Sequence, residues 1–317
     1  MNLTLPSTLK NPILDIAASF WDDERYRAFR VCYRSMRIMD DLVDDAKSAG
    51  GIPNQQQRVE ISLILKQTLE SLEKPHRAAP GLPQELAELR ETIMRFKIPL
   101  WPWRRLARSM AYDLTHSGFE TFLSFARYAK GAAVAPASVF VHLIGLKEGP
   151  DGYAAAPVDC YTSARPLAMF SYMTHIMRDF RDDFALSLEY IPASMRERFG
   201  VSQGDLESSA VGSQTENFTA LIANYHQLAA GYRQKSRPAR LPIYAHLDEA
   251  YRYSLEVIWE LYAQIHDNIE KANFQLDPAL IHPSAEDLFG RLESVGRRMK
   301  LAPGFLKRGA KRLGMPL

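Results

Sequence analysis

The sequence predicts an all-α fold. Apolar residues recur at helical spacing along most of its 317 residues. No alternating stretch is long enough for a convincing strand, and no repeat of fixed period is present. The connecting segments are too short to separate domains. We therefore expect one all-helical domain over residues 1–317, with roughly eight to eleven helices and a basic C-terminal tail at about 297–317.

The first half of the chain contains four predicted helices. Pro12 occupies a helix start position, and apolar side chains then recur as far as residue 45. A break rich in Gly, Pro and Asn follows at residues 48–54. Further helices are expected at residues 55–73 and 84–96, and another opens after Ile98-Pro99 and runs to residue 114.

The second half begins with an apolar stretch rich in small residues, from Thr121 to Leu146, in which Pro136 is expected to kink the helix. Residues 147–157 read as a loop containing Gly and Pro. Three more helices are expected, at residues 159–185, 218–232 and 245–271, with Pro238 and Pro242 interrupting the pattern between the last two.

Composition indicates a reduced, intracellular protein. Cys32 and Cys160 are too few for a disulfide framework. The first twenty residues lack a signal peptide pattern, and no stretch reaches the ~20 uninterrupted apolar residues of a membrane-spanning helix. We expect a cytoplasmic protein that at most touches a membrane surface.

Charge is spread unevenly along the chain. The formal net charge is +2, yet residues 291–317 hold eight Lys or Arg against one Glu. Because apolar residues are interleaved with these cations, the tail is suited to an anionic membrane surface; a solvated terminus is the alternative. We do not expect nucleic acid binding, since the basic residues are confined to the tail and no recognised module surrounds them.

Two aspartate-rich stretches carry the chemistry. Asp40 and Asp44, and likewise Asp179 and Asp183, are four residues apart, so each pair lies on one face of a helix. Like charges at this spacing repel each other, so two such pairs call for a cation. Acidic runs are usually solvated helix faces, but the repetition of the same pattern favours a metal site.

Each pair also has an arginine just upstream. Clustered carboxylate oxygens suit Mg²⁺, which keeps part of its water and bridges to substrate phosphates. Arg37 and Arg178 precede the two pairs, as expected if the anion to be held is a diphosphate.

These motifs resemble the squalene/phytoene synthase family of isoprenyl diphosphate enzymes, and the similarity extends in order over nearly the whole chain. Matching blocks are Tyr33 to Asp44, Ile98-Pro99, Met110 to Leu114, Arg178 to Asp183 and Tyr190-Ile191-Pro192. The resemblance implies an isoprenoid synthase fold, a helical bundle in which the two aspartate helices face each other across a deep central cavity.

The resemblance also implies roles for individual residues. Mg²⁺ held by the carboxylates would grip an allylic isoprenyl diphosphate. The metal residues would be Asp40, Asp44, Asp179 and Asp183, with Asp41 in support. Arg37, Arg178 and Tyr262 would bind the diphosphate.

Two departures from the family pattern concern catalytic positions. The family has a tyrosine with a proton-handling role before a Val-Ala-Gly segment, whereas Lys130 or Gly131 stands there in this chain, depending on the alignment. Tyr128 is a candidate substitute. Where the family has an Asn that helps to hold metal, this chain has His175, which would orient a substrate, act as a base near pH 7, or be a hydrogen-bonded helix residue without a catalytic part.

A third departure concerns the acceptor. The family often carries several arginines after the second aspartate pair, but residues 184–189 are mostly apolar here. We therefore expect one bound prenyl diphosphate and transfer of the prenyl group to a small aromatic acceptor such as a carbazole, with His175 or Lys130 orienting or deprotonating it. The alternatives are head-to-head condensation with a second prenyl diphosphate, and a non-catalytic assembly or binding protein on the same fold.

Overall fold

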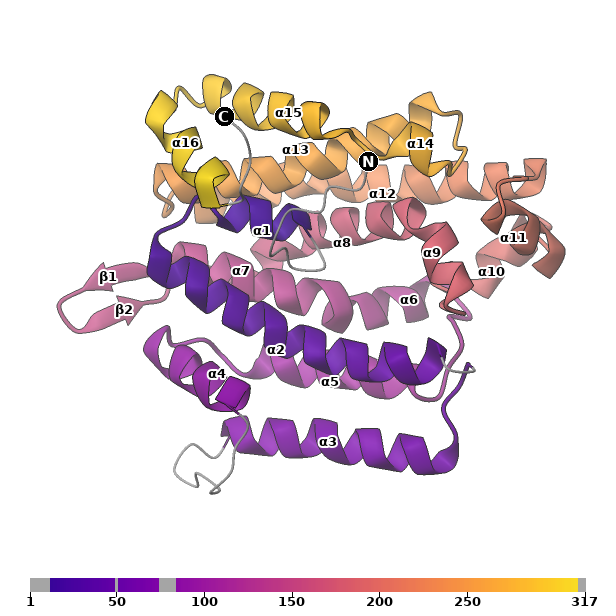
Figure 1. The fold of residues 1–317 in the computed structure, drawn as a ribbon, viewed down its shortest axis with the longest axis horizontal. Coiled ribbons are helices and arrows are strands. Elements are labelled where there is room, and N and C mark those ends of the chain that lie inside the picture. The colour runs from indigo at the N-terminus through magenta and orange to yellow at the C-terminus, as the bar shows by residue number, and fades with distance from the viewer. Residues whose placement is uncertain (1–11, 49–50, 74–83, 313–317) are drawn as a thin grey trace.

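A computed structural model describes residues 12–48, 51–73 and 84–312. Within these ranges nearly every element is a helix, as predicted, and Figure 1 shows the helices stacked in rows. In chain order they are α1 (Pro12–Ala18), α2 (Asp23–Ser48), α3 (Gln55–Glu73), α4 (Gln84–Arg95), α5 (Trp101–Asp113), α6 (Phe122–Ala129), the π-helix η1 (Lys130–Val134), α7 (Ala135–Gly145), α8 (Cys160–Arg178), α9 (Phe180–Ala185), α10 (Ala193–Arg198), α11 (Gln203–Ala210), α12 (Glu216–Tyr244), α13 (Glu249–Lys271), α14 (Pro278–Ile281), α15 (Ala285–Arg298) and α16 (Pro303–Arg312).

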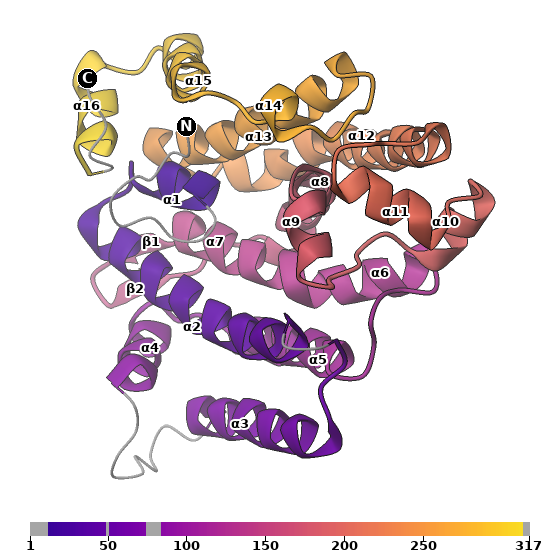
Figure 2. The ribbon, with the colours of Figure 1, turned by 45° about the vertical axis from the view of Figure 1, so that its right-hand side comes forward.

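The helices form a layered bundle. In Figures 1 and 2, α8 lies between α7 and α12, while α3 and α15 lie at opposite edges. The buried apolar side chains of the described residues form one continuous cluster, which includes Trp103, Phe170 and Tyr253. None of the described helices is long and apolar enough to cross a membrane.

The first predicted helix is broken in two. Between α1 and α2, Asp22 Oδ1 accepts a 2.9 Å hydrogen bond from the backbone N–H of Arg25, so Asp22 caps the start of α2. The Trp21 indole donates to Ser254 Oγ over 2.7 Å, which anchors the break to α13. The prediction of one helix over residues 12–45 was therefore wrong, because a capping side chain lies inside a stretch with continuous apolar periodicity.

A second expected helix, residues 159–185, is interrupted at Asp179. This residue ends α8 and precedes α9 with φ −100° and ψ 10°, outside the helical region. The Asp183 N–H still donates to the Asp179 carbonyl over 2.9 Å, so the four-residue spacing of the second aspartate pair is retained across the break.

Residues 122–145 form α6, η1 and α7 rather than one helix kinked at Pro136. Gly131 in η1 packs directly on α5, since a Cβ there would overlap the Arg105 carbonyl and Ser109 Oγ. The π-helix accommodates this close approach by adding a residue to one turn, so the irregularity lies one turn before the proline.

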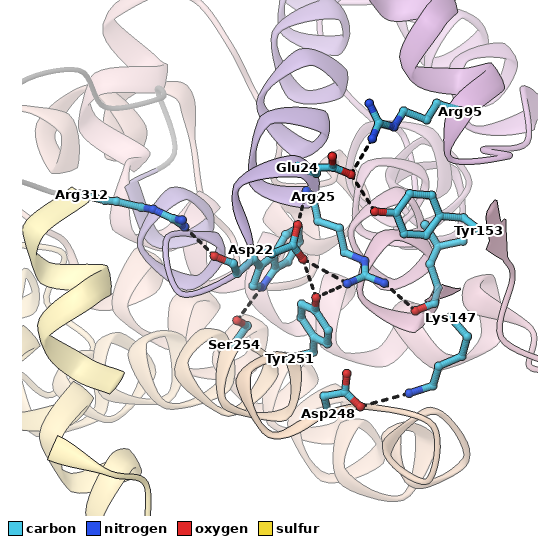
Figure 3. Close-up of polar contacts among 12 residues, drawn as sticks. Asp22, Glu24, Arg25, Arg95, Lys147, Tyr153, Asp248, Tyr251, Ser254 and Arg312 are labelled. Atoms are coloured by element: carbon cyan, nitrogen blue, oxygen red, sulfur yellow. Dashed lines mark hydrogen bonds and ion pairs between the residues drawn. The ribbon is translucent and has the colours of Figure 1, made fainter. Parts of the chain in front are cut away.

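A short hairpin replaces part of the loop expected at residues 147–157. Strands β1 (Lys147–Gly149) and β2 (Gly152–Ala154) pair antiparallel, with Glu148 opposite Tyr153. Tyr153 stacks on Phe96 and donates to Glu24 at the start of α2 over 2.9 Å (Figure 3). Strands of three residues are too short to show an alternating pattern in the sequence.

The helix expected to end near residue 232 continues to Tyr244, through Pro238 and Pro242. Phe180 of α9 contacts Phe218, and Phe170 of α8 lies under the Arg233 guanidinium, so α12 is packed along α8. Burial along this interface outweighs the hydrogen bonds that the two prolines remove.

The basic tail is folded onto the bundle. Phe305 of α16 stacks on Phe20, with ring centroids 5.5 Å apart. Arg312 donates to the Ser19 and Trp21 carbonyls over 2.8 and 2.6 Å. Residues 313–317, the end of the predicted tail, lie outside the described residues.

Candidate active site

A cavity of about 410 Å³ runs through the middle of the bundle, lined mainly by α2, α7, α8, α12 and α13. One end is acidic, and most of the remaining wall is apolar. The carboxylates at the acidic end belong to Asp40, Asp44, Asp179, Asp182 and Asp183.

The first aspartate motif lies within α2, as the spacing predicted. Asp40 and Asp44 both line the cavity, one turn apart, together with Arg37. The Arg37 guanidinium donates to Asp40 and to Asp41. Asp41 is not among the lining residues, and it contacts this site through Arg37.

The second motif is organised by Arg178. Its Nε and Nη2 donate to the two oxygens of Asp179 over 2.5 and 2.7 Å. Burial alone would raise the pKa of Asp179, but these bonds and the nearby positive charge lower it. Arg178 is not among the lining residues, so it fixes the Asp179 carboxylate from behind the cavity wall.

His175 lines the cavity one turn before Asp179. Its Nδ1 lies 2.5 Å from Arg178 Nη2, a nitrogen that only donates, so Nδ1 is the acceptor and the ring proton is on Nε2. Burial lowers the pKa of His175 to about 4, a larger effect than the opposing one of Asp179. A neutral imidazole of this tautomer is a hydrogen-bond donor through Nε2.

Asp183 shows that the two motifs meet. Its pKa is raised to about 8, first by burial and then by the carboxylates of Asp179, Asp44 and Asp182. Since Asp44 belongs to α2 and Asp183 to α9, stretches far apart in sequence form one acidic site. This concentration of carboxylates, most of them half-buried, calls for a compensating cation.

The donor set fits Mg²⁺ in the presence of a phosphate ligand. Among the described residues, no three His, Cys, Asp or Glu side chains are close enough together to form a closed metal cage. Mg²⁺ at phosphate sites is usually held by one or two carboxylates together with phosphates and water. Hard carboxylate oxygens on two facing helices suit that arrangement, in which a diphosphate completes the coordination.

Tyr128 lines the cavity and is connected to a buried ion pair. Its hydroxyl hydrogen-bonds to Asp113, whose carboxylate lies 3.4 Å from Lys47 Nζ. Burial, followed by neighbouring tyrosines and carboxylates, raises the pKa of Tyr128 well above its usual value. Tyr128 is therefore protonated, and its single hydroxyl proton is donated to Asp113.

Lys130 is not among the residues that line the cavity. The lining residues of this segment recur at helical spacing, and they are Tyr128, Ala132, Ala133, Pro136, Ala137, Phe140 and Val141. Lys130 stands two residues after Tyr128, roughly 200° around a helix, which accounts for its absence from that face.

Several lining residues were not singled out by the sequence pattern. Tyr262 was expected in the site and does line it, but so do Tyr33, Tyr172 and Tyr190, and Tyr172 and Tyr190 make a T-shaped contact. Tyr33 and Tyr190 lie within blocks that match the family pattern, which was the available signal. Asp182 lies in the matching block Arg178 to Asp183 as well, whereas Arg240 lies in none of them.

A comparison with protein families gives the decisive observation: residues 15–287 match the model of the squalene/phytoene synthase family. The chain belongs to this family. A chloroplastic phytoene synthase from an Oncidium hybrid cultivar is 25% identical over 253 residues, covering 79% of this chain and 56% of that protein. A 15-cis-phytoene synthase from Synechococcus elongatus is 24% identical over 221 residues, covering 66% and 68%. The chain thus spans about half the length of the plant relatives it matches.

Solved structures of this family have the same fold. A dehydrosqualene synthase in complex with ligand superposes with a TM-score of 0.72 at 18% identity, covering 92% of this chain and 93% of that one. The squalene synthase HpnC from Alicyclobacillus acidocaldarius gives 0.65 at 15% identity, with 82% and 88% covered. The isoprenoid synthase fold predicted from the sequence is confirmed.

Proposed function

We propose that this family member is a Mg²⁺-dependent prenyltransferase that ionises an allylic isoprenyl diphosphate and joins it to a second prenyl diphosphate. The observation that supports it most is the meeting of two aspartate motifs at one end of a cavity whose other walls are mainly apolar. That arrangement suits a substrate with a diphosphate head and a hydrocarbon tail.

The acidic end would hold the leaving group. Asp40, Asp44, Asp179 and Asp183 would bind Mg²⁺, which when bound supplies positive charge where the allylic carbon–oxygen bond breaks. Arg37, which lines the cavity beside them, would bind the diphosphate directly. Arg178 would act through Asp179 and His175, because its guanidinium already engages both.

Polar groups of the cavity wall would position the substrate. His175 presents a protonated Nε2, so we assign it to orienting a diphosphate oxygen rather than to base catalysis. The one hydroxyl proton of Tyr128 is donated to Asp113, so we assign Tyr128 to the cavity wall, where its oxygen can accept a hydrogen bond but not donate one. Tyr262 lies near Arg178 and lines the same end. The apolar walls would exclude water from the prenyl cation until the acceptor attacks. We assign no role to Lys130.

The choice of acceptor follows from the relatives. Those named above are phytoene, dehydrosqualene and squalene synthases, and none has an aromatic acceptor in its name. This favours the head-to-head condensation over transfer to an aromatic acceptor such as a carbazole, for which no described feature provides support.

Purified protein incubated with geranyl, farnesyl or geranylgeranyl diphosphate and Mg²⁺ tests the proposal, with mass spectrometry of the products. We expect a condensed hydrocarbon or a cyclopropyl diphosphate intermediate, and no product when EDTA removes the metal. Prenylated carbazole or indole in competition reactions, without condensed product, would instead establish the aromatic acceptor.

Contact with a membrane surface is a separate proposal. Phe305 packs against the bundle, whereas Lys300, Lys307 and Lys311 are exposed. These lysines would attract anionic lipid without inserting a helix. Sedimentation with phosphatidylserine vesicles should decrease in a Lys307→Glu/Lys311→Glu variant; equal pelleting of the two proteins would contradict the contact.

A further inference from the structure

Arg240 is a buried cation in the apolar part of the cavity. It lines the cavity wall with only 4% of its surface exposed. Its lining neighbours in space include Leu255, whose carbonyl accepts a hydrogen bond from Arg240 Nη1 over 3.2 Å. A guanidinium in such surroundings is costly unless its donors find acceptors.

Arg240 lies away from the acidic end. Along α13, Tyr262 and Leu255 both line the cavity, and seven residues of helix separate them by about 10 Å. Tyr262 lies near Arg178 at the acidic end. Leu255, and Arg240 hydrogen-bonded to its carbonyl, therefore lie about two helical turns away from that end. The diphosphate-binding end and Arg240 are therefore separated along the length of the cavity.

The protein itself satisfies Arg240 poorly. Among the described residues, the polar contacts of Arg240 use a single nitrogen, Nη1, which lies 3.2 Å from the Leu255 carbonyl and 3.4 Å from Glu256 Oε1, both long for charged hydrogen bonds. Its Nε is buried without a partner.

Arg25, which is similarly buried, provides a comparison within the same molecule (Figure 3). Its Nη1 donates to Asp22 and Tyr251, and its Nη2 donates to the Leu146 carbonyl over 2.9 Å. The Nε of Arg25 is buried without a partner as well, so that nitrogen does not distinguish the two arginines. Both terminal nitrogens of Arg25 have acceptors, whereas Nη2 of Arg240 has none among the described residues and remains as a donor for a ligand in the cavity.

The charge of Arg240 is already balanced. Glu256 forms an ion pair with it and also accepts a hydrogen bond from Tyr244. A second anion is therefore not required at this point. What the site lacks is a neutral oxygen acceptor next to apolar walls.

We propose that Arg240 forms a polar subsite for an oxygen-bearing chain end, a hydroxyl or carbonyl group at the tail of an isoprenoid whose diphosphate lies at the aspartates. This rests on the proposed function, because that function places the diphosphate. The subsite selects oxygenated over purely hydrocarbon chains.

The test measures equilibrium binding by calorimetry, with Mg²⁺ present. The ligands are geranyl and farnesyl diphosphates, each paired with its ω-hydroxy analogue. In the wild-type protein we expect one hydroxylated analogue to bind at least about tenfold more tightly than its parent, which is the gain in affinity expected from one hydrogen bond to a charged group. Arg240→Met should abolish that preference. Arg237→Met removes an exposed cation from the same helix that does not line the cavity, and it should leave the preference unchanged.

If the wild-type protein binds each hydroxylated analogue no more tightly than its parent diphosphate, the proposed subsite is refuted. A preference for the hydroxylated analogue that survives in Arg240→Met also refutes it. If Arg240→Met does not fold, Arg240→Lys keeps the charge opposite Glu256 but loses the guanidinium fork, and it should reduce the preference. Because binding is measured without turnover, a protein that shows the preference but forms no condensed product would refute the proposed function and not the subsite.

Discussion

Asp183 of α9 and Asp44 of α2 belong to one electrostatic unit, since burial and the carboxylates of Asp179, Asp44 and Asp182 together raise the pKa of Asp183 to about 8. Repulsion among these carboxylates destabilises the protein unless a bound cation compensates it. This electrostatic coupling links the two aspartate motifs more directly than their shared cavity alone. A mutation that removes one carboxylate can therefore reduce activity without reducing stability.

Neutralising one of these carboxylates should remove activity without unfolding the protein. For Asp44→Asn and Asp183→Asn we expect product formation to fall by about 10²-fold or more, because a ligand to the diphosphate-binding cation is lost. The melting temperature should not fall, since like-charge repulsion is relieved. The matched control is Asp45→Asn, an exposed residue of α2 outside the cavity. Loss of activity in Asp45→Asn as large as in Asp44→Asn would contradict the assignment.

Removing only one partner of the Lys47–Asp113 pair behind Tyr128 should destabilise the protein. Its side chains are only 5% and 8% exposed, so Lys47→Met leaves Asp113 buried without a cation. We expect a loss of about 3 to 5 kcal/mol in the free energy of unfolding, measured by urea denaturation. The double variant Lys47→Met/Asp113→Leu should recover most of it, because the uncompensated charge is gone. A double variant no more stable than Lys47→Met would argue against this explanation.

Two stacked histidines should make stability depend on pH. The rings of His226 and His266 lie 3.5 Å apart, and each Nε2 hydrogen-bonds to the other residue's carbonyl, over 2.9 and 3.2 Å. Burial, followed by the adjacent His266, lowers the pKa of His226. The unfolded chain therefore binds a proton more readily, so stability should fall as the pH drops below the ordinary value of 6.5.

His226→Gln should weaken this dependence, seen as a smaller difference between urea denaturation curves at about pH 7 and about pH 5. His246→Gln, in the turn after α12, is the matched control and should resemble the wild type. Burial lowers the pKa of His142 too, so some dependence will remain in every variant. An unchanged difference in His226→Gln would show that the pair is not responsible.

A pair of glycine substitutions tests the contact between η1 and α5. Gly131→Ala places a methyl group against the Arg105 backbone, and we expect a loss of about 1 to 3 kcal/mol. Gly290→Ala in α15 has nothing within 4 Å, and it should gain about 0.5 to 1 kcal/mol from its helix propensity. Thermal denaturation of both variants gives the comparison. Similar shifts in the two would mean that η1 can move away from α5.

The sequence was sufficient for the fold class and for the acidic end of the site, because both depend on local spacing. Asp40 and Asp44 lie one turn apart on α2 as predicted, and helical periodicity located α3 and α5 closely. It failed where a tertiary contact overrides a local signal. Pro238 does not end α12, because packing along α8 holds that helix together, and Asp22 starts a new helix within an unbroken apolar pattern.

Cavity residues outside the motifs could not be predicted from local sequence patterns, because tertiary contacts bring them to the cavity. Arg240 reaches the cavity only because α12 continues past Pro238, and no nearby residue type marks it as a cavity residue. Lys130 was expected in the site because it stands where the family pattern has a tyrosine. The structure keeps Tyr128 on the lining face and leaves Lys130 off it.

The π-helix also affects how this chain is compared with its relatives. A π turn holds one residue more than an α turn, so a helix containing η1 is one residue longer than a regular helix joining the same two points. If a relative has a regular helix here, an ungapped alignment can be correct on one side of residues 130–134 and offset by one on the other. Whether Lys130 or Gly131 aligns with the family's tyrosine is an ambiguity of this kind, a difference of one residue. Removing one residue from η1 should therefore give a regular helix between the same two points, so Tyr128 before η1 and Phe140 after it should keep their places on the cavity wall.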